Sequence, residues 1–447
     1  MKNNTEIESF LSTNPAVEWV DAFMIDANGL ARGKRVPVAD LPQIYSAGVQ
    51  FSACAPLLDV RGLGQGAAGL GTDDGDPDGT GWPLAQTLKL APWALRPTAQ
   101  VQLELRDVAR REPLWWDPRT ILADVVSRCR ADGIHPIVAC ELEFYLIDPR
   151  RARDAPLAPA ASPLTGHAPR AAANLSLAAL DENAAFLTAL QEAAVAQDIP
   201  ASSAVAEYGV GQFEINLNHI PDPVKAADHA ALLRRLVKGV AQSRNVEATF
   251  MPKPFLQQPG NGFHIHVSIV DPAGNNRFGA TGGAALLRHA VAGMQALTLD
   301  SLAIFAPHFN AHRRFQSVFV AQTLDWGYNN RSVAFRIPVA DAAAQRIEHR
   351  VAGADASPHL VMAAVLAAIH HGITNRLTAT EPVSARVSGV LPEFSAGLLH
   401  SLDRLERSAL LARYIPERYL HAYAQLKRGE YAALMEQVLP GELDFYL

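Results

Sequence analysis

The sequence predicts an α+β protein with a small β-rich unit at the N-terminus and a larger unit that mixes strands and helices. Three observations support this fold class. Residues 17–37 read VEWVDAFMIDANGLARGKRVP, in which two short apolar runs flank a D-x-N-G turn, as in a β-hairpin. Four segments between residues 138 and 351 alternate polar and apolar residues, as strands do. Residues 117–133, 177–197 and 224–247 have apolar residues at helical spacing.

The N-terminal unit is predicted to be a domain of residues 14–108. After the hairpin, residues 62–81 are rich in Gly and Asp, which is typical of a loop. A further strand, AQVQLEL, ends at Leu105. Short strands separated by turn residues therefore account for this whole unit.

The larger unit is predicted to be a second domain of residues 115–447. Its first helix begins after Asp117, a suitable N-cap residue, and has a proline in its first turn. Residues 360–369 form an apolar run that predicts a buried helix, because a membrane span needs roughly 18–20 such residues. From about Glu393 onward the pattern is helical again.

Composition excludes several classes of protein. Lys plus Arg number 39 and Asp plus Glu number 45, so the net charge is −6 with no basic block, and we expect no nucleic-acid partner. No segment suits a membrane, and MKNNTEIESF lacks the apolar region of a signal peptide. The cysteines, Cys54, Cys129 and Cys140, are too far apart for a disulfide framework, so a cytoplasmic location is expected.

Four strand-like segments carry an unusual polar face. They read VACELEFYLI, EYGVGQFEINLNH, GNGFHIHVSI and RIEHRV. Because side chains alternate along a strand, each segment gathers its polar residues on one side. Strand by strand, these residues are Glu141 and Glu143; Gln212, Glu214, Asn216 and Asn218; His264, His266 and Ser268; Arg346, Glu348 and Arg350.

An ordinary solvated face would explain any one of these strands. The set differs, because its faces hold Glu, His, Asn, Gln and Arg but no Lys. Glutamates that share one cavity repel one another unless cations lie between them. Carboxylate oxygens with one imidazole suit hard or borderline ions, so Mg²⁺ or Mn²⁺ is expected, with two or more ions per site. The candidate ligands are Glu141, Glu143, Glu207, Glu214, His264 and Glu348.

A second group of candidates is cationic. It includes the arginines of HRRF, NNRSVAFRIP and RIEHRV. An isolated exposed arginine usually only solubilises a surface, which is the interpretation for Arg313. Arginines inside apolar strands instead need anions, and phosphate and carboxylate are the natural ones. Metal ions with several arginines indicate phosphoryl transfer, in which catalysis consists mainly of charge neutralisation and positioning.

With these motifs the sequence resembles glutamine synthetase and its γ-glutamyl-amide ligase relatives. Five motifs occur in the family's order: ELEFYLID, EYGVGQFEINL, FMPKPF followed by GNGFHIHVSI, NNRSVAFRIP, and RIEHRVAGADASPHL. The similarity extends from about Val17 to the C-terminus. It implies an N-terminal β-grasp domain and a catalytic domain around a curved antiparallel sheet. It also implies homo-oligomers, hexameric rings stacked as a dodecamer, with each active site at a subunit boundary.

The resemblance assigns a role to each candidate residue. It implies one metal ion held by Glu143, Glu207 and Glu214, and a second held by Glu141, His264 and Glu348. It places His266, Ser268, Arg331 and Arg346 on the ATP side, and Arg331 and Arg336, with Glu348, at the transferred phosphate. It places Gly260, Arg314 and Arg350 at the glutamate.

The implied reaction has two steps. ATP phosphorylates the γ-carboxylate of glutamate, and an amine then attacks the γ-glutamyl phosphate to form an amide. Two departures concern the amine. Ser52 stands where ammonia-using enzymes have an aspartate, and Val320, preceded by Phe319, stands where they have a glutamate. An amine with an apolar body would gain roughly 25 cal/mol per Å² of buried apolar surface in such a pocket.

The sequence therefore predicts an ATP-dependent ligase that joins glutamate to an organic amine, in amine catabolism. Phe319 and Val320 favour a monoamine, whereas the acidic loop at residues 73–78 could anchor a polyamine. Three alternatives remain: an ordinary ammonia-using glutamine synthetase, a non-catalytic protein with this fold, and a ligase for an amino acid or a sugar amine. The filled ligand positions argue against the second alternative.

Overall fold

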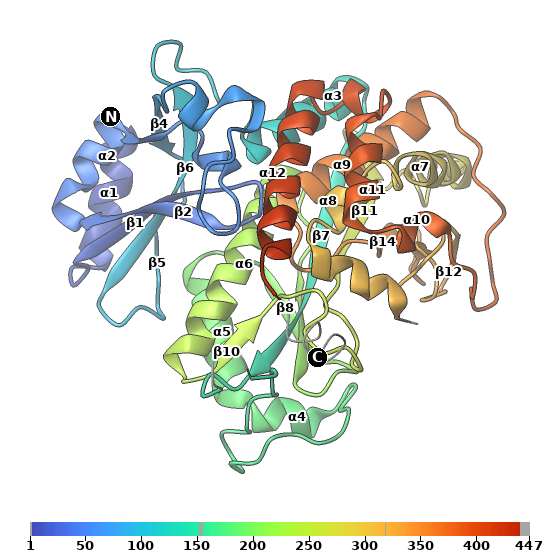
Figure 1. Ribbon diagram of the computed structural model, residues 1–447, viewed down its shortest axis with the longest axis horizontal. Coiled ribbons are helices and arrows are strands. Elements are labelled where there is room, and N and C mark those ends of the chain that lie inside the picture. The colour runs from blue at the N-terminus through green and yellow to red at the C-terminus, as the bar shows by residue number, and fades with distance from the viewer. Residues whose placement is uncertain (1, 152–154, 318, 439–447) are drawn as a thin grey trace.

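Two β-sheets organise the chain in the computed structural model, which describes residues 2–151, 155–317 and 319–438. One sheet lies within residues 19–107 and the other within residues 135–349 (Figure 1). Helices pack around both sheets, so the predicted α+β class is confirmed. The predicted domain limits of 14–108 and 115–447 stay a prediction, and residues 439–447 lie outside the described part of the chain.

The N-terminal sheet has the strand order β2-β1-β6-β4-β3, with β5 paired to β6 outside this path. Its strands are β1 (Trp19–Ile25), β2 (Ala31–Pro37), β3 (Val49–Ser52), β4 (Asp78–Pro83), β5 (Lys89–Leu90) and β6 (Thr98–Asp107). Strands β1 and β2 form the predicted antiparallel hairpin, whereas β1 and β6 are parallel. Helices α1 (Lys2–Thr13) and α2 (Leu41–Ala47) contribute Ile7, Leu41 and Ile44 to the core of this sheet.

The hairpin turn is held by one buried carboxylate. Asp26 Oδ1 accepts hydrogen bonds from the backbone N–H of Asn28 at 2.9 Å and of Leu30 at 2.8 Å. Its Oδ2 accepts from Arg32 Nε at 2.8 Å. Gly29 has φ +68°, a conformation that glycine adopts without strain. The D-x-N-G signal in the sequence therefore corresponds to a specific Asp-capped turn.

The loop predicted at residues 62–81 is partly wrong. It contains short 3₁₀ turns at Ala67–Gly69 and Gly71–Asp73, and its last residues belong to β4. Gly81, at the end of this segment, is needed for packing, because a Cβ there would lie 2.9 Å from a methyl carbon of Leu103. Close packing between β4 and the neighbouring strand β6 determines the structure here. The local sequence pattern gives no sign of this packing.

The second sheet has the strand order β12-β13-β14-β11-β7-β9-β8, with β10 paired to β7. Its strands are β7 (His135–Ile147), β8 (Ala201–Ala206), β9 (Gln212–Leu217), β10 (Glu247–Thr249), β11 (Phe263–Val270), β12 (Trp326–Tyr328), β13 (Phe335–Ile337) and β14 (Ile347–His349). All pairs are antiparallel except β12 with β13, which is parallel. The expected antiparallel sheet is therefore a mixed one at this edge. A three-residue strand has too little sequence to indicate whether it pairs in parallel or antiparallel with its neighbour.

Helices cover the second sheet and fill the core beside it. They are α3 (Pro118–Ala131), α4 (Leu177–Glu182), α5 (Ala184–Ala196), α6 (Pro223–Ser243), α7 (Gly283–Leu297), α8 (Leu302–Phe305) and α9 (Pro358–Thr374). Asp117 caps α3 as predicted, by accepting a 2.8 Å hydrogen bond from the backbone N–H of Arg119. The apolar run at residues 360–369 is buried within α9, also as predicted. The helix expected at residues 177–197 is divided in two at Asn183.

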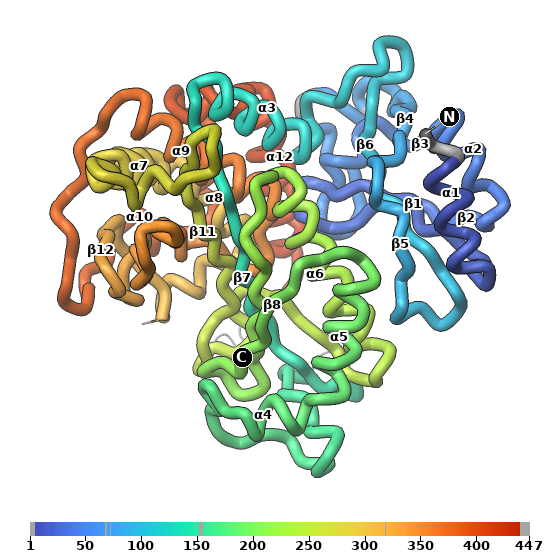
Figure 2. The backbone as a smooth tube through the Cα atoms, turned by 180° about the vertical axis from the view of Figure 1, so that it is seen from behind, coloured from blue at the N-terminus to red at the C-terminus, as the bar shows by residue number. Residues whose placement is uncertain are grey.

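The C-terminal region is helical, as predicted. It forms α10 (Pro392–Ser395), α11 (Gly397–Glu406) and α12 (Glu417–Met435). Both ribbon and tube views place α12 at the boundary between the N-terminal sheet and the rest of the chain (Figures 1 and 2). Within the described part of the chain, every helix is too short or too polar to cross a bilayer, and the three cysteines are free.

A buried ion cluster joins the two parts of the chain. The carboxylate of Asp228, on α6, accepts hydrogen bonds from Gln102 Nε2 of β6 at 2.6 Å and from Arg119 Nε of α3 at 3.1 Å. It also lies 2.8 Å from His359 Nε2 of α9. Burial alone would raise the pKa of Asp228, but the charge of Arg119 and the bond with His359 lower it to about 2. Asp228 therefore connects one strand with three helices.

Replacing Asp228 with Asn should destabilise the folded chain by about 3 kcal/mol at pH 7, because Arg119 and His359 would lose a buried anion. The depressed pKa stabilises the fold above pH 4 and ceases to do so as the pH falls toward about 2. Urea unfolding at pH 7 and at pH 3.5 should therefore show a smaller difference between variant and wild type at the lower pH.

The matched control is Asp222→Asn, because Asp222 only caps α6 and Asn is also a good N-cap residue. A D228N protein that unfolds at the same urea concentration as D222N would contradict the structural role given to this cluster.

Candidate active site

The predicted polar faces become one surface because their strands are neighbours in the second sheet. Strand β7 lies between β11 and β9, and β14 lies on the other side of β11. The antiparallel register places Glu143 opposite Glu214, Glu141 opposite His264, and His266 opposite Glu348. The alternate residues Leu142 and Phe144 are buried in the hydrophobic core behind the sheet. The register therefore brings together carboxylates that are far apart in the sequence.

This polar face forms the floor of a cavity of about 670 Å³. All six predicted metal ligands line the cavity, and so do most of the residues predicted to contact glutamate, amine or phosphate. These lining residues are Glu141, Glu143, Glu207, Glu214, His264, Glu348, Gly260, Arg314, Arg350, Phe319, Val320, Arg331 and Arg336. Carboxylates, guanidinium groups and apolar side chains therefore meet in one space.

Two groups of side chains could each hold a metal ion. Their possible ligand atoms lie within 4.8 Å of one another, and the groups are Glu141, His266 and Glu348, and Glu141, Glu214 and His264. Glu141 belongs to both groups, whereas the predicted division gave it to one ion. Glu143 and Glu207 belong to neither group but line the same cavity. The division of ligands between two ions stays a prediction.

Two of the carboxylates have a pKa above the usual range. Burial, followed by the charge of Glu143, raises the pKa of Glu207 to about 7. Burial and the charges of Glu141 and Glu143 raise the pKa of Glu214 well above its usual value. Anionic groups that crowd one another in this way favour either protons or metal cations. The electrostatics thus fit a site for divalent cations.

Two further carboxylates, Glu141 and Glu348, are already paired with cationic groups or donors. Burial opposes ionisation of Glu141, but hydrogen bonds from His264 and His266 hold its pKa below the usual range. Burial also opposes ionisation of Glu348, but Arg350 and the two histidines lower its pKa to about 2. Glu348 Oε2 accepts a 2.7 Å hydrogen bond from Arg336 Nη1, and Oε1 accepts one from Arg350. Glu348 therefore joins the carboxylates to the arginines.

His266 is engaged at both ring nitrogens. Arg346 Nε donates to His266 Nδ1 at 3.2 Å, and a guanidinium group can only donate. The proton must then be on Nε2, which donates to Glu141 Oε1 at 2.8 Å. This arrangement favours His264 over His266 as a metal ligand. Ser268 follows on the same strand, and its hydroxyl donates to the backbone oxygen of Gln345 at 2.9 Å. His266, Ser268 and Arg346 thus extend along the sheet beside the cavity.

Arg314 enters the cavity from the 3₁₀ helix η5 (Phe309–Gln316). Only 1% of Arg314 is exposed, and its Nη1 donates to the backbone oxygen of Val351 at 3.0 Å. Gly260 packs against it so closely that a Cβ there would lie 2.8 Å from Arg314 Cγ and 2.5 Å from the oxygen of Pro252. A larger residue at position 260 would therefore displace Arg314 or the backbone at Pro252.

Ser52 is the one predicted substrate residue that the structure places apart. It ends β3 in the N-terminal sheet and does not line the cavity of its own chain. Its hydroxyl donates to Asp76, which belongs to the acidic loop at residues 73–78, and it contacts Cys54 Sγ at 3.0 Å. Ser52 and the acidic loop are therefore one local unit.

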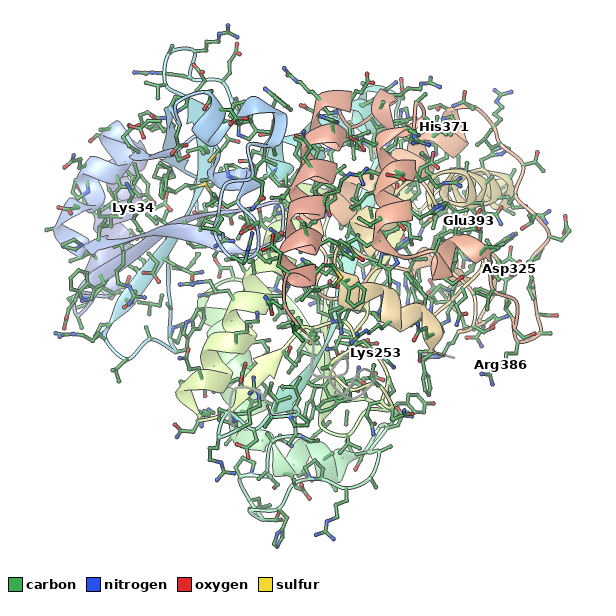
Figure 3. All side chains as sticks on the ribbon, in the orientation of Figure 1. Lys34, Lys253, Asp325, His371, Arg386 and Glu393 are labelled. Atoms are coloured by element: carbon green, nitrogen blue, oxygen red, sulfur yellow. The ribbon has the colours of Figure 1, made fainter. Side chains whose placement is uncertain are left out.

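The structure adds cavity residues that the sequence analysis missed. Tyr208 follows Glu207, and its ring centroid lies 5.3 Å from that of Phe319. About half of each residue is exposed, 49% for Tyr208 and 50% for Phe319. Arg386, in the loop after α9, also lines the cavity, and Figure 3 labels it near the edge of the molecule. Tyr208 could have been identified from the sequence, because it is adjacent to Glu207. No local pattern marks Arg386.

Comparison with known families agrees with this geometry. Residues 116–446 match the family described as glutamine synthetase, catalytic domain. The match covers well over half of the chain, so the protein belongs to the glutamine synthetase family. The family predicted from the ordered motifs is thereby confirmed.

Individual relatives place the chain beside enzymes that use organic amines. It is 37% identical over 449 residues to the gamma-glutamylputrescine synthetase PuuA of Escherichia coli (strain K12), covering 99% of this chain and 94% of that protein. It is 30% identical to a glutamate–isopropylamine ligase of a Pseudomonas species, covering 95% and 93% of the two chains. The solved structure titled Apo GmaS without ligand has a TM-score of 0.79 at 25% identity, with 97% of each chain covered.

Metal binding should release protons, and more of them at pH 6 than at pH 8. The pKa of Glu207 is raised to about 7, so this carboxylate is largely protonated at pH 6 and must lose its proton to bind a cation. Titration calorimetry with Mg²⁺ or Mn²⁺ in buffers of different ionisation enthalpy would count the protons. Affinity should rise with pH across this range.

The variant Glu207→Gln serves as the control, because it cannot release this proton. An equal proton count for wild type and E207Q at pH 6 would contradict the assignment of Glu207 as a titrating ligand.

Proposed function

We propose that this protein is an ATP-dependent ligase that joins the γ-carboxylate of glutamate to an organic amine. One observation carries the proposal: a single cavity combines the carboxylates and arginines suited to phosphoryl transfer with a rim of Tyr208, Phe319 and Val320. The two relatives reported above are named for amine substrates, which supports the same reaction here.

The donor set fits Mg²⁺ or Mn²⁺, with two or more ions per site. The carboxylates of Glu143, Glu207 and Glu214 and the group of Glu141, His264 and Glu348 offer oxygen and imidazole ligands, and thiolates are not among them. Bound divalent ions would neutralise phosphate oxygens of ATP. The raised pKa values of Glu207 and Glu214 support this fit, because such crowding is relieved by cations.

We assign the cavity arginines to the transferred phosphate and to glutamate. Arg331 and Arg336 line the cavity beside Glu348, where they can stabilise charge on the phosphoryl group as it moves to the γ-carboxylate. Arg314 and Arg350 can hold the remaining carboxylate of glutamate. The product of this step is γ-glutamyl phosphate, in which a poor leaving group has become a good one.

In the second step the amine nitrogen forms a bond to the γ-carbon, the bond from that carbon to the phosphate oxygen breaks, and the amine loses a proton. The rim of the cavity favours an acceptor with an apolar body. Tyr208, Phe319 and Val320 bury apolar surface, and the two rings can also contact a cationic amine through their faces. A monoamine fits this rim best, and a polyamine would need the further anchor that Asp76 carries beside Ser52.

The place of Ser52 supports an oligomer. In the family resemblance, the residue at this position belongs to the amine site, yet Ser52 lies outside the cavity of its own chain. A neighbouring chain would therefore have to supply it. We propose hexameric rings, stacked as a dodecamer, in which the N-terminal domain of one subunit completes the cavity of the next.

A panel of amines tests the reaction. Glutamate-dependent ATP hydrolysis should be clearly faster with organic monoamines or diamines than with ammonia at equal concentration, because Ser52 and Val320 offer ammonium no carboxylate. The variant Glu207→Ala should lose the metal-dependent turnover. Activity with ammonia alone would favour an ordinary glutamine synthetase, and unchanged turnover of E207A would contradict the site.

The aromatic rim should determine the affinity for amines. Phe319→Ala or Tyr208→Ala should raise the KM for an apolar amine about tenfold, since one lost ring contact corresponds to roughly 1–1.5 kcal/mol. The KM values for glutamate and ATP should stay within about twofold. Tyr208→Phe is the matched control, because it keeps the ring and should retain the wild-type KM for the amine. Equal effects on all three substrates would contradict a specific amine contact.

A further inference from the structure

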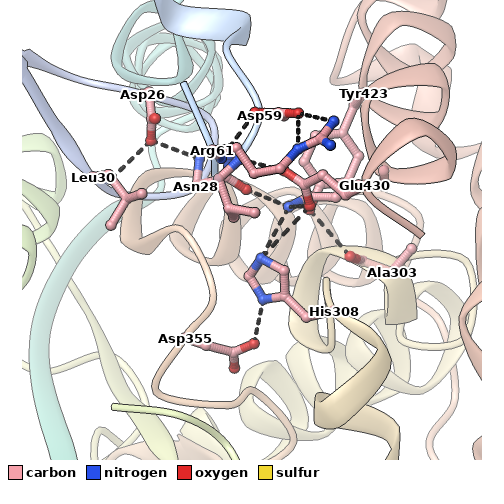
Figure 4. Close-up of polar contacts among 12 residues, drawn as sticks. Asp26, Asn28, Leu30, Asp59, Arg61, Ala303, His308, Asp355, Tyr423 and Glu430 are labelled. Atoms are coloured by element: carbon pink, nitrogen blue, oxygen red, sulfur yellow. Dashed lines mark hydrogen bonds and ion pairs between the residues drawn. The ribbon is translucent and has the colours of Figure 1, made fainter. Parts of the chain in front are cut away.

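A lysine on α12 is completely buried and fully paired. Lys427 has 0% exposure, and its ammonium donates to Asn28 Oδ1, to Glu430 Oε2 at 3.0 Å and to His308 Nε2 at 3.3 Å. Figure 4 labels these three partners. An ammonium group has three donors, so each of them is used. Asn28 is in the hairpin turn of the N-terminal sheet, so Lys427 connects that turn with α12 and with the segment before η5.

The lysine determines which nitrogen of His308 carries the proton. The ammonium can only donate, so Nε2 must accept and Nδ1 must carry the hydrogen. Nδ1 lies 2.6 Å from Asp355 Oδ2 and donates to it. The opposite tautomer would direct Nε2–H at Glu430 Oε2, which at 3.8 Å is too far for a hydrogen bond. His308 therefore accepts a hydrogen bond from Lys427 and donates one to Asp355.

Asp355 also lies close to Arg314, the arginine predicted to bind glutamate. Its second oxygen, Oδ1, is buried and has no hydrogen-bond partner among the described residues. A Cβ on Gly353 would lie 2.5 Å from Asp355 Oδ1 and 3.3 Å from Arg314 Nη1, so both groups press against the same glycine. Glu143 and Asp355 are the two carboxylates whose charges favour the cationic form of Arg314. Glu143 lines the cavity and Asp355 does not, so the charge of Asp355 acts on the guanidinium from outside the cavity.

We infer that His308 is a positioning residue for glutamate. It holds Asp355 close to Arg314, which keeps the guanidinium directed into the cavity. Through Lys427 and Asn28, the same chain of contacts ties this direction to the N-terminal domain. The inference rests on the proposed function, which places glutamate at Arg314.

The test compares kinetic constants with stability. His308→Ala should raise the KM for glutamate about tenfold while the KM for ATP stays within about twofold, because only the guanidinium loses its support. His308→Asn places an amide N–H near the position of Nδ1, so it can still donate to Asp355 and should restore most of the affinity for glutamate. If H308A does not fold, Asp355→Asn supplies the same comparison, because it removes the charge and keeps an acceptor for His308.

A matched control separates positioning from general destabilisation. His370 also belongs to a polar cluster, with Nε2 2.7 Å from Asp132 and Nδ1 3.0 Å from the hydroxyl of Tyr414, but it does not line the cavity. His370→Ala should lower the Tm without changing the KM for glutamate. A rise in that KM in H370A as large as in H308A, or none in H308A, would overturn the inference.

Arg314→Lys distinguishes this failure from failure of the proposed function. If R314K raises the KM for glutamate and H308A does not, only the positioning role is wrong. If R314K leaves that KM unchanged, the assignment of Arg314 to glutamate is wrong, and the positioning role of His308 is then wrong as well.

Discussion

The gathering of carboxylates on one face of the second sheet is the constraint on which the rest of the site depends. Glu143 faces Glu214 across a strand pair, and Glu207 lies at the same cavity. These carboxylates stay together despite their mutual repulsion, because the opposite face of the same strands is packed in the hydrophobic core through Leu142 and Phe144. The apolar face therefore supplies the stability that the polar face gives up, which is common at functional sites.

Cationic groups and hydrogen-bond donors reach these carboxylates from several separate elements. Histidines on β11 pair with Glu141, arginines from β13 and from the end of β14 pair with Glu348, and Arg314 comes from η5. The balance is uneven, because Glu207 and Glu214 keep raised pKa values while Glu348 is held low. The uneven balance explains why one cavity can offer an anionic end to metal ions and a cationic end to phosphate and glutamate.

The N-terminal part of the chain contributes to the site in two ways. Within one chain, the hairpin turn at Asn28 contacts Lys427, and Lys427 connects through His308 to Asp355, which packs with Arg314 around Gly353. The acidic unit of Ser52 and Asp76 lies outside the chain's own cavity, and this separation is the basis of the oligomer proposed above. These two connections would make both glutamate and amine binding sensitive to how the domains are held together.

The sequence by itself determined the elements whose patterns are long enough to read: the Asp26 hairpin, the Asp117-capped helix, the buried helix α9 and the four polar strand faces. It also determined the family, because five ordered motifs are specific. Only the tertiary structure decided the parallel pairing of β12 with β13, the strand β4 with its packed Gly81, the ring pair of Tyr208 and Phe319, and the Lys427 cluster. These features depend on contacts between residues far apart in the chain, and a local pattern cannot encode which distant side chain will be its partner.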